Sequence, residues 1–351
     1  MKTFSPDRFF DQTQKKKLPC AIKQISIENY QGIKKTNIAD IPVDTQWILL
    51  TGDNGFGKTM VLQAIAISLF GDQDQQRILT GPDCHTRVEF KNHGNNQINI
   101  LGTPQFQSFT HLVAYGSSRL EIQNQQTRNE ISAKSTTTYG LFHTDGILLN
   151  IEYELFISYL KKNAKYGIIK NTLLKLLPLI ADIQVNDNDE VVYIEKEHEN
   201  SNKTYDALPY EKLASGPKNI IAMIGDMLIR FYAGQPEVIE PQYFCGIVLI
   251  DELDLHLHPK WQRKLPKLLS NVFPKVQFIA STHSVIPFLG APENSVFLKV
   301  NRSQAQGITI ARIDIDISNL LPNSLLTSPL FDLEGKDIKS ENNQSLNKTG
   351  N

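Results

Sequence analysis

The chain has 351 residues, of which 40% are hydrophobic and 21% charged, as in a globular protein with a sizeable core. Its 36 Lys and Arg balance 37 Asp and Glu, and this net charge of -1 neither indicates nor excludes nucleic-acid binding, which depends on a local basic face. The three cysteines lie far apart without a CxxC pair, which argues against a disulfide framework, and no run approaches the ~20 apolar residues of a membrane span.

The first elements of the chain predict a strand, a glycine loop and a helix. Residues 1–17 form a polar lead-in without the apolar core of a signal peptide, so we expect a cytoplasmic protein. Residues 20–33 alternate apolar and polar side chains as a half-buried strand does. Residues 45–52 predict a second strand that ends in a glycine turn, and residues 59–71 carry apolar side chains at helical spacing.

The middle of the chain is less regular. Three short strand-like runs come first, at 86–90, 97–101 and 110–116. Residues 116–150 are polar and rich in Gln and Asn, and we expect a long mobile excursion there. Two helices broken near Gly167 follow, and then a hairpin that turns at Asn186 to Asp189.

The last third predicts a regular alternation of helices and strands. Helical patterns cover 217–234 and 259–273, and apolar strands cover 245–250 and 276–282. The final residues, 331–351, are polar, and we expect them to be disordered. The alternation predicts an α/β fold.

The segment GDNGFGKT, which follows the second strand, has the pattern G-x-x-x-x-G-K-[ST] and opens a helix. Its glycines let backbone N–H groups curl around phosphate oxygens, and the helix N-terminus adds partial positive charge. Lys58 would reach the β- and γ-phosphates, and Thr59 would place its hydroxyl on Mg²⁺. The predicted ATP-binding residues are Gly52, Asp53, Asn54, Gly55, Phe56, Gly57, Lys58 and Thr59.

Two adjacent carboxylates end the apolar strand at 245–250. A carboxylate at such a place is costly unless something binds it. We therefore predict that Asp251, with Thr59, holds Mg²⁺ and that Glu252 polarises the attacking water as general base. His283 ends the next apolar strand, where a histidine can hydrogen-bond a γ-phosphate, and is the second predicted catalytic residue.

Two groups of Cys and His side chains invite comparison with metal sites. Cys84, His85 and His93 lack a fourth partner, and His256 and His258 lack a third. We interpret neither group as a metal site, and we expect the second to take part in a dimer contact.

Together these motifs resemble the ABC-type ATPase heads of the SMC and RecF superfamily. They are most similar to the stand-alone bacterial AAA ATPases that include the ATPase subunit of Septu-type anti-phage systems. The matching segments are IKQISIENYQGI, LTGDNGFGKTMVLQAIA (Walker A), KLASGPKN (signature), VLIDELDLHLHPKWQ (Walker B and D-loop) and FIASTHS. They cover roughly residues 20–115 and 205–300.

The resemblance implies a P-loop NTPase fold with a mixed sheet flanked by helices and a helical insertion. The chain would then divide into the lead-in (1–17), an ATPase lobe with Walker A (18–115), a helical lid with a hairpin (116–205), a second ATPase lobe (206–330) and the tail (331–351).

The resemblance also implies a homodimer, with ATP held between the Walker A segment of one protomer and the signature loop of the other. Ser215 and Gly216 would then reach the nucleotide in trans, and Leu257 and His258 would form the D-loop. Where the family has a serine that touches the γ-phosphate, this chain has Ala214, so we expect slow turnover.

Three residues occupy the place of a γ-phosphate sensor in such heads: Tyr115, Gly116 and Arg119.

The stretch after Arg119 has room for a helical lid but not for an SMC arm, and neither a Toprim nuclease nor an HNH signature follows His283. We therefore expect an ATP-binding and ATP-hydrolysing dimeric switch, or a higher oligomer, that controls a separate effector protein in bacterial anti-phage defence. An HNH-type nuclease is the expected class of effector. A RecF-like repair ATPase that acts on DNA directly, and a low-turnover ATP-binding scaffold, stay open as alternatives.

Overall fold

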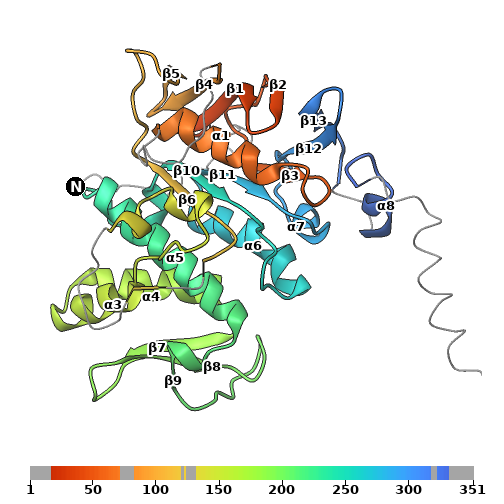
Figure 1. The fold of residues 1–351 in the computed structure, drawn as a ribbon. Coiled ribbons are helices and arrows are strands. Elements are labelled where there is room, and N and C mark those ends of the chain that lie inside the picture. Colours follow the sequence, from red (N-terminus) through yellow and green to blue (C-terminus); the bar gives the residue numbers. More distant parts are fainter. Residues whose placement is uncertain (1–16, 72–82, 120–121, 124–131, 318–321, 332–351) are drawn as a thin grey trace, which may run out of the picture.

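A computed structural model describes residues 17–71, 83–119, 122–123, 132–317 and 322–331. Most of the lead-in and of the polar tail therefore lies outside the described residues. Ten strands form one mixed sheet, in the order β5-β4-β1-β2-β13-β12-β3-β11-β10-β6 (Figure 1). A second sheet has the order β7-β8-β9.

Parallel strands form one half of the large sheet. They are β12 (Val296–Ser303), β3 (Trp47–Thr51), β11 (Val276–Ser281), β10 (Gly246–Ile250) and β6 (Leu112–Tyr115). Every residue of β3, β11, β10 and β6 is buried, as expected for parallel strands that are covered on both faces.

The other half of the sheet is antiparallel. It consists of β5 (Asn95–Ile100), β4 (His85–Asn92), β1 (Ala21–Tyr30), β2 (Ile33–Ile38) and β13 (Gly307–Ile313), which pairs with β12. The single strand predicted at 20–33 is wrong at its end, because the chain turns after Tyr30 and returns as β2. The α/β class with a mixed sheet is confirmed.

Helices cover both faces of the sheet. One face packs against α1 (Lys58–Phe70), and the other against α5 (Ser215–Gly234) and α6 (Pro259–Val272). Alternate residues of β3 serve the two cores: Ile48 and Leu50 lie in the first, Trp47 and Leu49 in the second. Among the helices of the described residues, none is long and apolar enough to cross a bilayer.

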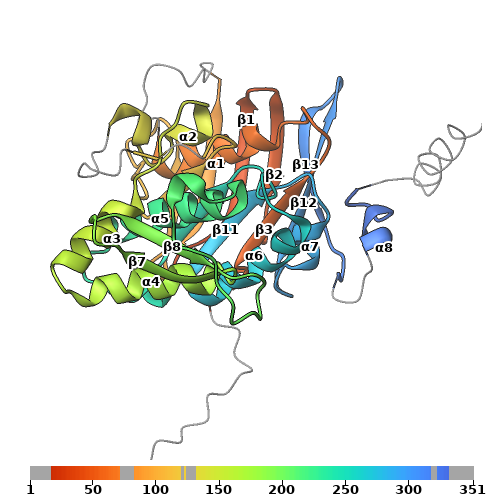
Figure 2. The ribbon, with the colours of Figure 1, turned by 90° about the horizontal axis from the view of Figure 1, so that it is seen from below.

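The smaller sheet lies with two helices of the second core. Figures 1 and 2 both show α3 and α4 next to β7 and β8. These elements are α3 (Ile151–Leu160), α4 (Ala164–Leu176), β7 (Ile180–Val185), β8 (Val191–Glu195) and β9 (Leu208–Pro209). The short helices are η1 (Ala133–Ser135), α2 (Tyr139–Phe142), η2 (Tyr210–Lys212), η3 (Pro241–Tyr243), α7 (Ile286–Leu289) and α8 (Pro322–Leu326). The predicted hairpin turn is confirmed, since the N–H of Asn186 donates to the carbonyl of Glu190 at 2.9 Å.

The break between α3 and α4 falls before the predicted position. Lys162 adopts a left-handed φ of 50°, and the Asn163 side chain accepts a hydrogen bond from the N–H of Lys165 at 3.0 Å. Asparagine is a favourable residue at a helix start because it satisfies a backbone donor in this way. Gly167 lies inside α4. The break near Gly167 was therefore a wrong prediction.

The mobile excursion expected over 116–150 is also wrong for residues 132–150. A buried ion pair between Asp226 and Arg230 of α5 holds this stretch. Asp226 accepts from the N–H of Leu149 at 2.9 Å, and Arg230 donates to the carbonyl of Ser135 at 2.9 Å. The polar composition misled the prediction because these polar groups are paired inside the fold rather than solvated. Residues 120–121 and 124–131 lie outside the described residues.

Glu152, near the start of α3, gives a testable pH dependence. Burial, and after it the charge of Glu211, raise the pKa of its carboxyl group, the Tyr193 hydroxyl lowers it, and the resulting pKa is about 8. The pKa of an unfolded glutamate is about 4.5, so Glu152 binds its proton more tightly in the folded protein than in the unfolded chain. This contribution to stability is complete below pH 4.5 and is lost as the pH rises through 8.

We expect the free energy of unfolding to fall over that window by on the order of a few kcal/mol. Urea melts at several pH values should show this slope in the wild type and lose it in Glu152→Gln. The exposed Glu197→Gln is the control and should keep the wild-type slope. An unchanged slope in Glu152→Gln would contradict the assignment.

Candidate active site

Three neighbouring strands of the sheet bring the predicted site residues together. β3, β11 and β10 are adjacent and parallel, so their C-terminal ends share one edge. Residues 52–59 follow β3, His283 lies just beyond β11, and the two carboxylates follow β10. Ligands of open α/β sheets bind at this kind of edge.

At two positions in the loop between β3 and α1, the backbone conformation and its close neighbours require glycine. Gly52 has φ of 146°, and a Cβ there would lie 2.3 Å from the carbonyl oxygen of Val300. Gly57 has φ of 99°, and its Cβ would lie 2.4 Å from the side chain of Ile308. The loop therefore packs closely against β12 and β13, which leave no room for a side chain at Gly52 or Gly57.

Lys58 is buried at the start of α1 and points back over the loop. Its Nζ donates to the carbonyl oxygens of Gly52 at 2.6 Å and Asp53 at 3.1 Å, and lies 3.2 Å from Nδ1 of His283. Burial lowers the pKa of Lys58, and the charge of Asp251 opposes that shift. These contacts hold the ammonium group over the loop and next to His283.

His283 carries its proton on the nitrogen away from Lys58. Burial lowers the pKa of this imidazole, and the positive charge of Lys58 lowers it further. An ammonium group can only donate, so Nδ1 accepts and Nε2 keeps the hydrogen. Nε2 is then a neutral donor available to a phosphate oxygen.

Thr59 and Asp251 form the oxygen pair that the sequence predicts for Mg²⁺. The Thr59 hydroxyl donates to Oδ2 of Asp251 at 2.7 Å, and Ser281 donates to the other carboxylate oxygen. Asp251 is only 4% exposed. Mg²⁺ is commonly held by one or two carboxylates together with substrate phosphates, and a hydroxyl beside a carboxylate fits it. Thr59 and Asp251 are the residues that would hold the ion.

Glu252 stands in an unusual backbone conformation. Its φ of 49° is in the left-handed region, which non-glycine residues seldom adopt. Its N–H donates to the Ser281 hydroxyl at 2.9 Å, and its carbonyl accepts from Arg119 at 2.6 Å. Such strain persists where surrounding contacts fix it, often at functional sites. The side chain is partly exposed, so water can reach it.

Arg119 is the main residue whose role the sequence did not reveal. It is 2% exposed, and its guanidinium donates to the carbonyl oxygens of Asp251 at 2.6 Å and Glu252 at 2.6 Å. Its Nε donates to the Asn219 side chain on α5 at 3.1 Å. The Tyr115 hydroxyl instead donates into the core, to Asp226 and the carbonyl of Met223. Arg119 therefore fixes the backbone at both acidic residues, which makes it a positioning residue, and the phosphate-sensor prediction is wrong for Tyr115.

We expect Arg119→Lys to lower ATP hydrolysis by about 10–100-fold, because a lysine cannot span both carbonyls with one planar fork. ATP affinity should change little, since Lys58 and the loop are untouched. Phosphate release and nucleotide titration measure the two effects. The exposed Arg312→Lys serves as the control, and an equal loss of affinity and rate would contradict a positioning role.

An open pocket of about 440 Å³ lies over the loop. It is lined by Thr51, Gly52, Asp53, Asn54, Phe56, His283, Lys299, Asn301, Leu326, Leu330 and Phe331. The predicted signature residues are not among them. Ser215 begins α5 and is exposed, and a Cβ at Gly216 would lie 3.6 Å from the carbonyl of His256. Within the described residues, the signature loop thus lies against the D-loop rather than on the pocket.

The two histidines after Walker B differ in role. Nδ1 of His258 accepts from the N–H of Lys260 at 3.3 Å and caps α6, and Leu257 beside it is buried. His256 is exposed, with a left-handed φ of 60°. Neither belongs to a group of three metal-ligating side chains among the described residues. A dimer contact through this turn stays a prediction.

Of the other Cys and His candidates, His93 behaves differently from its sequence neighbours. Cys84 and His85 join no such group within the described chain, but His93 lies with Cys20, His111 and Cys245. The expectation that His93 lacks further partners is therefore wrong, because those partners come from distant parts of the sequence.

Comparison with known families gives a match over more than half of the chain. Residues 48–286 match the family described as "AAA domain, putative AbiEii toxin, Type IV TA system". The matched range begins in β3 and ends in α7, and so includes the Walker A loop, both carboxylates and His283.

Several curated proteins are similar in sequence. "Septu protein PtuA" of Bacillus mycoides (strain KBAB4) is 26% identical over 339 residues, covering 89% of this chain and 45% of that protein. "Retron Ec83 probable ATPase" of Escherichia coli is 31% identical over 151 residues, covering 43% of this chain and 27% of that protein. "Retron Vc95 probable ATPase" of Vibrio cholerae serotype O1 biovar El Tor is 50% identical over 72 residues, covering 20% and 14%. The chain thus spans less than half the length of these relatives.

Among solved structures, the "SMC head domain from Thermotoga maritima" has a TM-score of 0.45 and 13% identity, covering 84% of this chain and 100% of that one. An SMC head bound to the C-winged helix domain of ScpA has a TM-score of 0.47, also at 13% identity, and covers 84% and 98%.

Proposed function

The chain belongs to this family of AAA domains, and on that premise we propose that it is a dimeric switch that binds and hydrolyses ATP. The observation that carries the proposal is the convergence of two pairs at one sheet edge. Lys58 lies against His283, and Thr59 is hydrogen-bonded to Asp251. A cation, a neutral donor and oxygen ligands side by side support the proposal that this edge binds the phosphates of ATP and a metal ion.

The geometry suits in-line hydrolysis. N–H groups of the loop and the Lys58 ammonium bind the β- and γ-phosphates, and Nε2 of His283 donates to a γ-phosphate oxygen. Mg²⁺ held by Thr59 and Asp251 would neutralise charge on the phosphates. Glu252 accepts a proton from water as the water oxygen bonds to the γ-phosphorus, and the bond from that phosphorus to the bridging oxygen breaks. The products are ADP and inorganic phosphate.

The position of the signature loop supports a dimer. Ala214 and Ser215 are exposed at the start of α5, and no side chain of the loop caps that helix. A helix N-terminus with free N–H groups attracts phosphate. We propose that Ser215 and Gly216 of a second copy close the pocket over the γ-phosphate. Ala214 has no hydroxyl to contact the γ-phosphate. Backbone N–H groups and Ser215 make that contact instead, and turnover is slow because this contact is weaker.

Mixing two inactive variants tests this arrangement. Lys58→Met should bind ATP too weakly to hydrolyse it at the concentration used, and Ser215→Arg should block the signature loop, so each alone is inactive. A mixed dimer contains one site with an intact loop and an intact partner signature. We therefore expect activity to return on mixing to about a quarter of the wild-type rate, from half of the dimers with one of two sites each.

Mixing Lys58→Met with Glu252→Gln is the matched control for that experiment. Lys58 and Glu252 belong to the same pocket of the same protomer. In the mixed dimer, one pocket lacks Lys58 and the other lacks Glu252, so neither pocket is complete. Activity should stay absent. Recovery in the control, or none in the test pair, would contradict a signature loop acting in trans.

The names of the relatives suggest the biological setting. One is a Septu protein and two are retron ATPases. We propose that the chain works in bacterial anti-phage defence and controls a separate effector, an HNH-type nuclease being the expected class. Affinity purification from the native cell with Mg²⁺ and ATP, followed by mass spectrometry, tests this. A co-purifying nuclease supports it. If only DNA or repair proteins co-purify, and duplex DNA stimulates ATP hydrolysis in a way that is lost steeply as salt rises, the RecF-like role would replace this proposal.

A further inference from the structure

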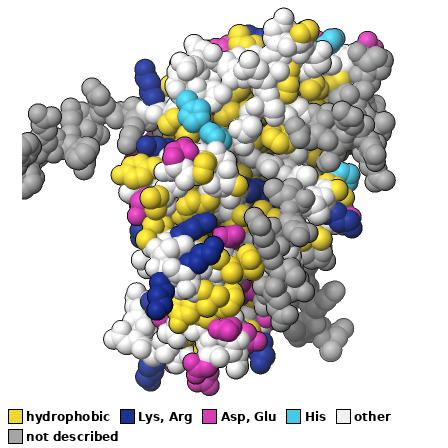
Figure 3. All heavy atoms as spheres, turned by 90° about the vertical axis from the view of Figure 1, so that its left-hand side faces the viewer, with side chains coloured by type: hydrophobic (Ala, Val, Ile, Leu, Met, Phe, Trp, Pro, Cys, Tyr) yellow, Lys and Arg dark blue, Asp and Glu magenta, His cyan; other side chains and the backbone are white. Residues whose placement is uncertain are grey.

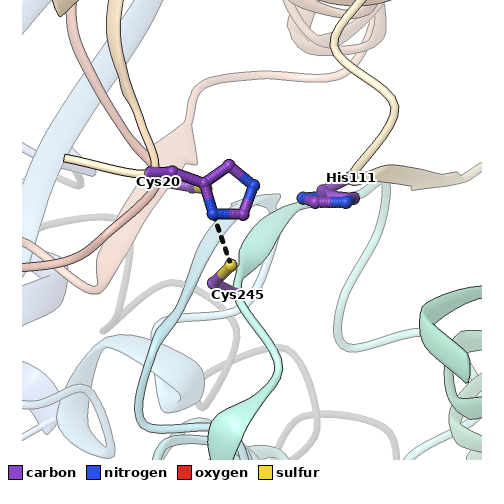
Figure 4. Close-up of side chains that lie close together, drawn as sticks. Cys20, His111 and Cys245 are labelled. Atoms are coloured by element: carbon purple, nitrogen blue, oxygen red, sulfur yellow. Dashed lines mark hydrogen bonds between the residues drawn. The ribbon is translucent and has the colours of Figure 1, made fainter. Parts of the chain in front are cut away.

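Four side chains from four separate segments converge at the sheet edge away from the ATP site. Cys20 precedes β1, His93 lies in the turn between β4 and β5, His111 precedes β6, and Cys245 precedes β10. One ligand atom from each lies within 4.8 Å of all the others. Figure 4 shows Cys20, His111 and Cys245 close together, and Nδ1 of His93 lies 3.8 Å from Sγ of Cys245.

These separations suit a single ion. Around a tetrahedral Zn²⁺, with bonds of about 2.0–2.3 Å, neighbouring ligand atoms lie about 3.3–3.8 Å apart. The contact between His93 and Cys245 already has that length, and the remaining atoms need only small shifts. A two-iron cluster with the same ligand types binds its cysteines and histidines to different irons. That arrangement does not allow a histidine nitrogen 3.8 Å from a cysteine sulfur.

The two cysteines of the cluster are buried, and the two histidines lie nearer the surface. Cys20 is 0% and Cys245 6% exposed, whereas His111 is partly exposed and His93 is exposed. The two rings lie with centroids 5.0 Å apart at 80°. Figure 3 shows histidine side chains next to each other at the surface on one side of the molecule. An ion can therefore enter from the imidazole side and reach thiols that solvent scarcely touches.

Contacts around the cluster orient two of the ligands. Nε2 of His111 lies 3.3 Å from the carbonyl oxygen of Gly234, which leaves its Nδ1 free to bind. Metal-binding histidines commonly donate their other N–H to such a carbonyl. The Gln235 side chain pairs with both the N–H and the carbonyl of Cys245, at 3.1 and 2.9 Å. This pairing fixes the backbone of one sulfur ligand.

The supporting backbone also links the ligands to one another. The N–H of Gly94 donates to the carbonyl of Pro19 at 2.9 Å, so the turn that carries His93 is tied to the residue before Cys20. His93 itself has a left-handed φ of 47°. The carbonyl of His111 accepts from Ile247, just after Cys245, at 3.0 Å. The four positions are thus held as two linked pairs.

We propose that Cys20, His93, His111 and Cys245 bind one structural Zn²⁺ per chain. Two thiolates and two imidazoles are a ligand set that zinc favours, and all four positions are protein ligands, as in closed structural sites. Cys245 and Asp251 lie at opposite ends of β10, about 20 Å apart along an extended strand. The ion therefore plays no part in hydrolysis. It joins the antiparallel β1 and β4 to the parallel β6 and β10.

Metal analysis of the full chain tests this proposal. The protein is purified under reducing conditions through a tag without histidine, and zinc, iron, copper and nickel are measured per chain. We expect about one zinc. His93→Ala, an exposed position whose loss leaves the core intact, should weaken zinc binding by more than about 100-fold, since losing even a residue that only orients a ligand costs 10–100-fold. Cys84→Ser, at the third cysteine, should keep the zinc.

Two further readouts keep the result independent of folding yield and of ATPase activity. Cobalt added to the zinc-free wild type should give the visible bands of a tetrahedral ion with thiolate ligands, and His111→Ala should change them. A chelator should lower the melting temperature of the wild type and of Cys84→Ser, but not that of His93→Ala. No bound metal after incubation with zinc, a different metal in its place, or a Cys20–Cys245 disulfide in the reduced preparation would overturn the proposal.

Discussion

Replacing Glu252 with glutamine should lower the ATP hydrolysis rate by about 100- to 10,000-fold, the usual contribution of a positioned general base. The amide keeps the size of the side chain but cannot accept the proton of the attacking water. ATP binding should persist, because Lys58, Thr59 and Asp251 are unchanged. The ATP-bound dimer should therefore accumulate. Phosphate release gives the rate, and light scattering with and without ATP gives the mass.

The exposed Glu237→Gln is the matched control and should hydrolyse ATP at the wild-type rate. If Glu252→Gln left both ATP turnover and ATP-dependent association unchanged, the catalytic assignment would be wrong. A loss of ATP binding in this variant would instead assign Glu252 to the stability of the loop after β10.

Lys58→Met should weaken ATP binding by about 10–100-fold or more, since it removes a charged donor to phosphate. The variant should fold at least as well as the wild type. Lys58 is buried and its pKa is lowered by that burial, so a methionine of similar length avoids the cost of desolvating an ammonium group. Nucleotide titration and a thermal melt separate the two expectations.

Lys35→Met is the control for charge, because Lys35 lies exposed on β2 with 75% of its side chain accessible. It should bind ATP like the wild type. If Lys58→Met retained full affinity, the phosphate-binding role of the loop would be refuted, whatever its stability.

The sequence predicts those parts of the site that are encoded by a short run of neighbouring residues. A glycine loop between a strand and a helix curls its backbone N–H groups inward, so the positions of Lys58 and Thr59 follow from the residues next to them. The contact of Thr59 with Asp251 follows in the same way, because the ends of parallel strands meet at one edge. The α/β class follows from strands that alternate with helices.

Other parts depend on contacts that no local pattern encodes. Arg119 reaches the carbonyls of Asp251 and Glu252 only because β6 and β10 are neighbours in the sheet. Cys20 and Cys245 have no spacing that marks them as partners. β12 and β13 also have no predicted counterpart in the sequence, although Val300 and Ile308 from these strands pack against the glycine loop.

The order of the strands sets when this protein can begin to work during its synthesis. β3 carries the glycine loop, yet both of its neighbours in the sheet, β11 (from Val276) and β12 (from Val296), come much later in the chain than β3, which ends at Thr51. The ribosome must therefore synthesise the long stretch between Thr51 and Val276 before β3 has a partner on either side. Such long-range pairing is slow to form. A prematurely terminated product would carry Lys58 without Glu252 or His283, and could not hydrolyse ATP.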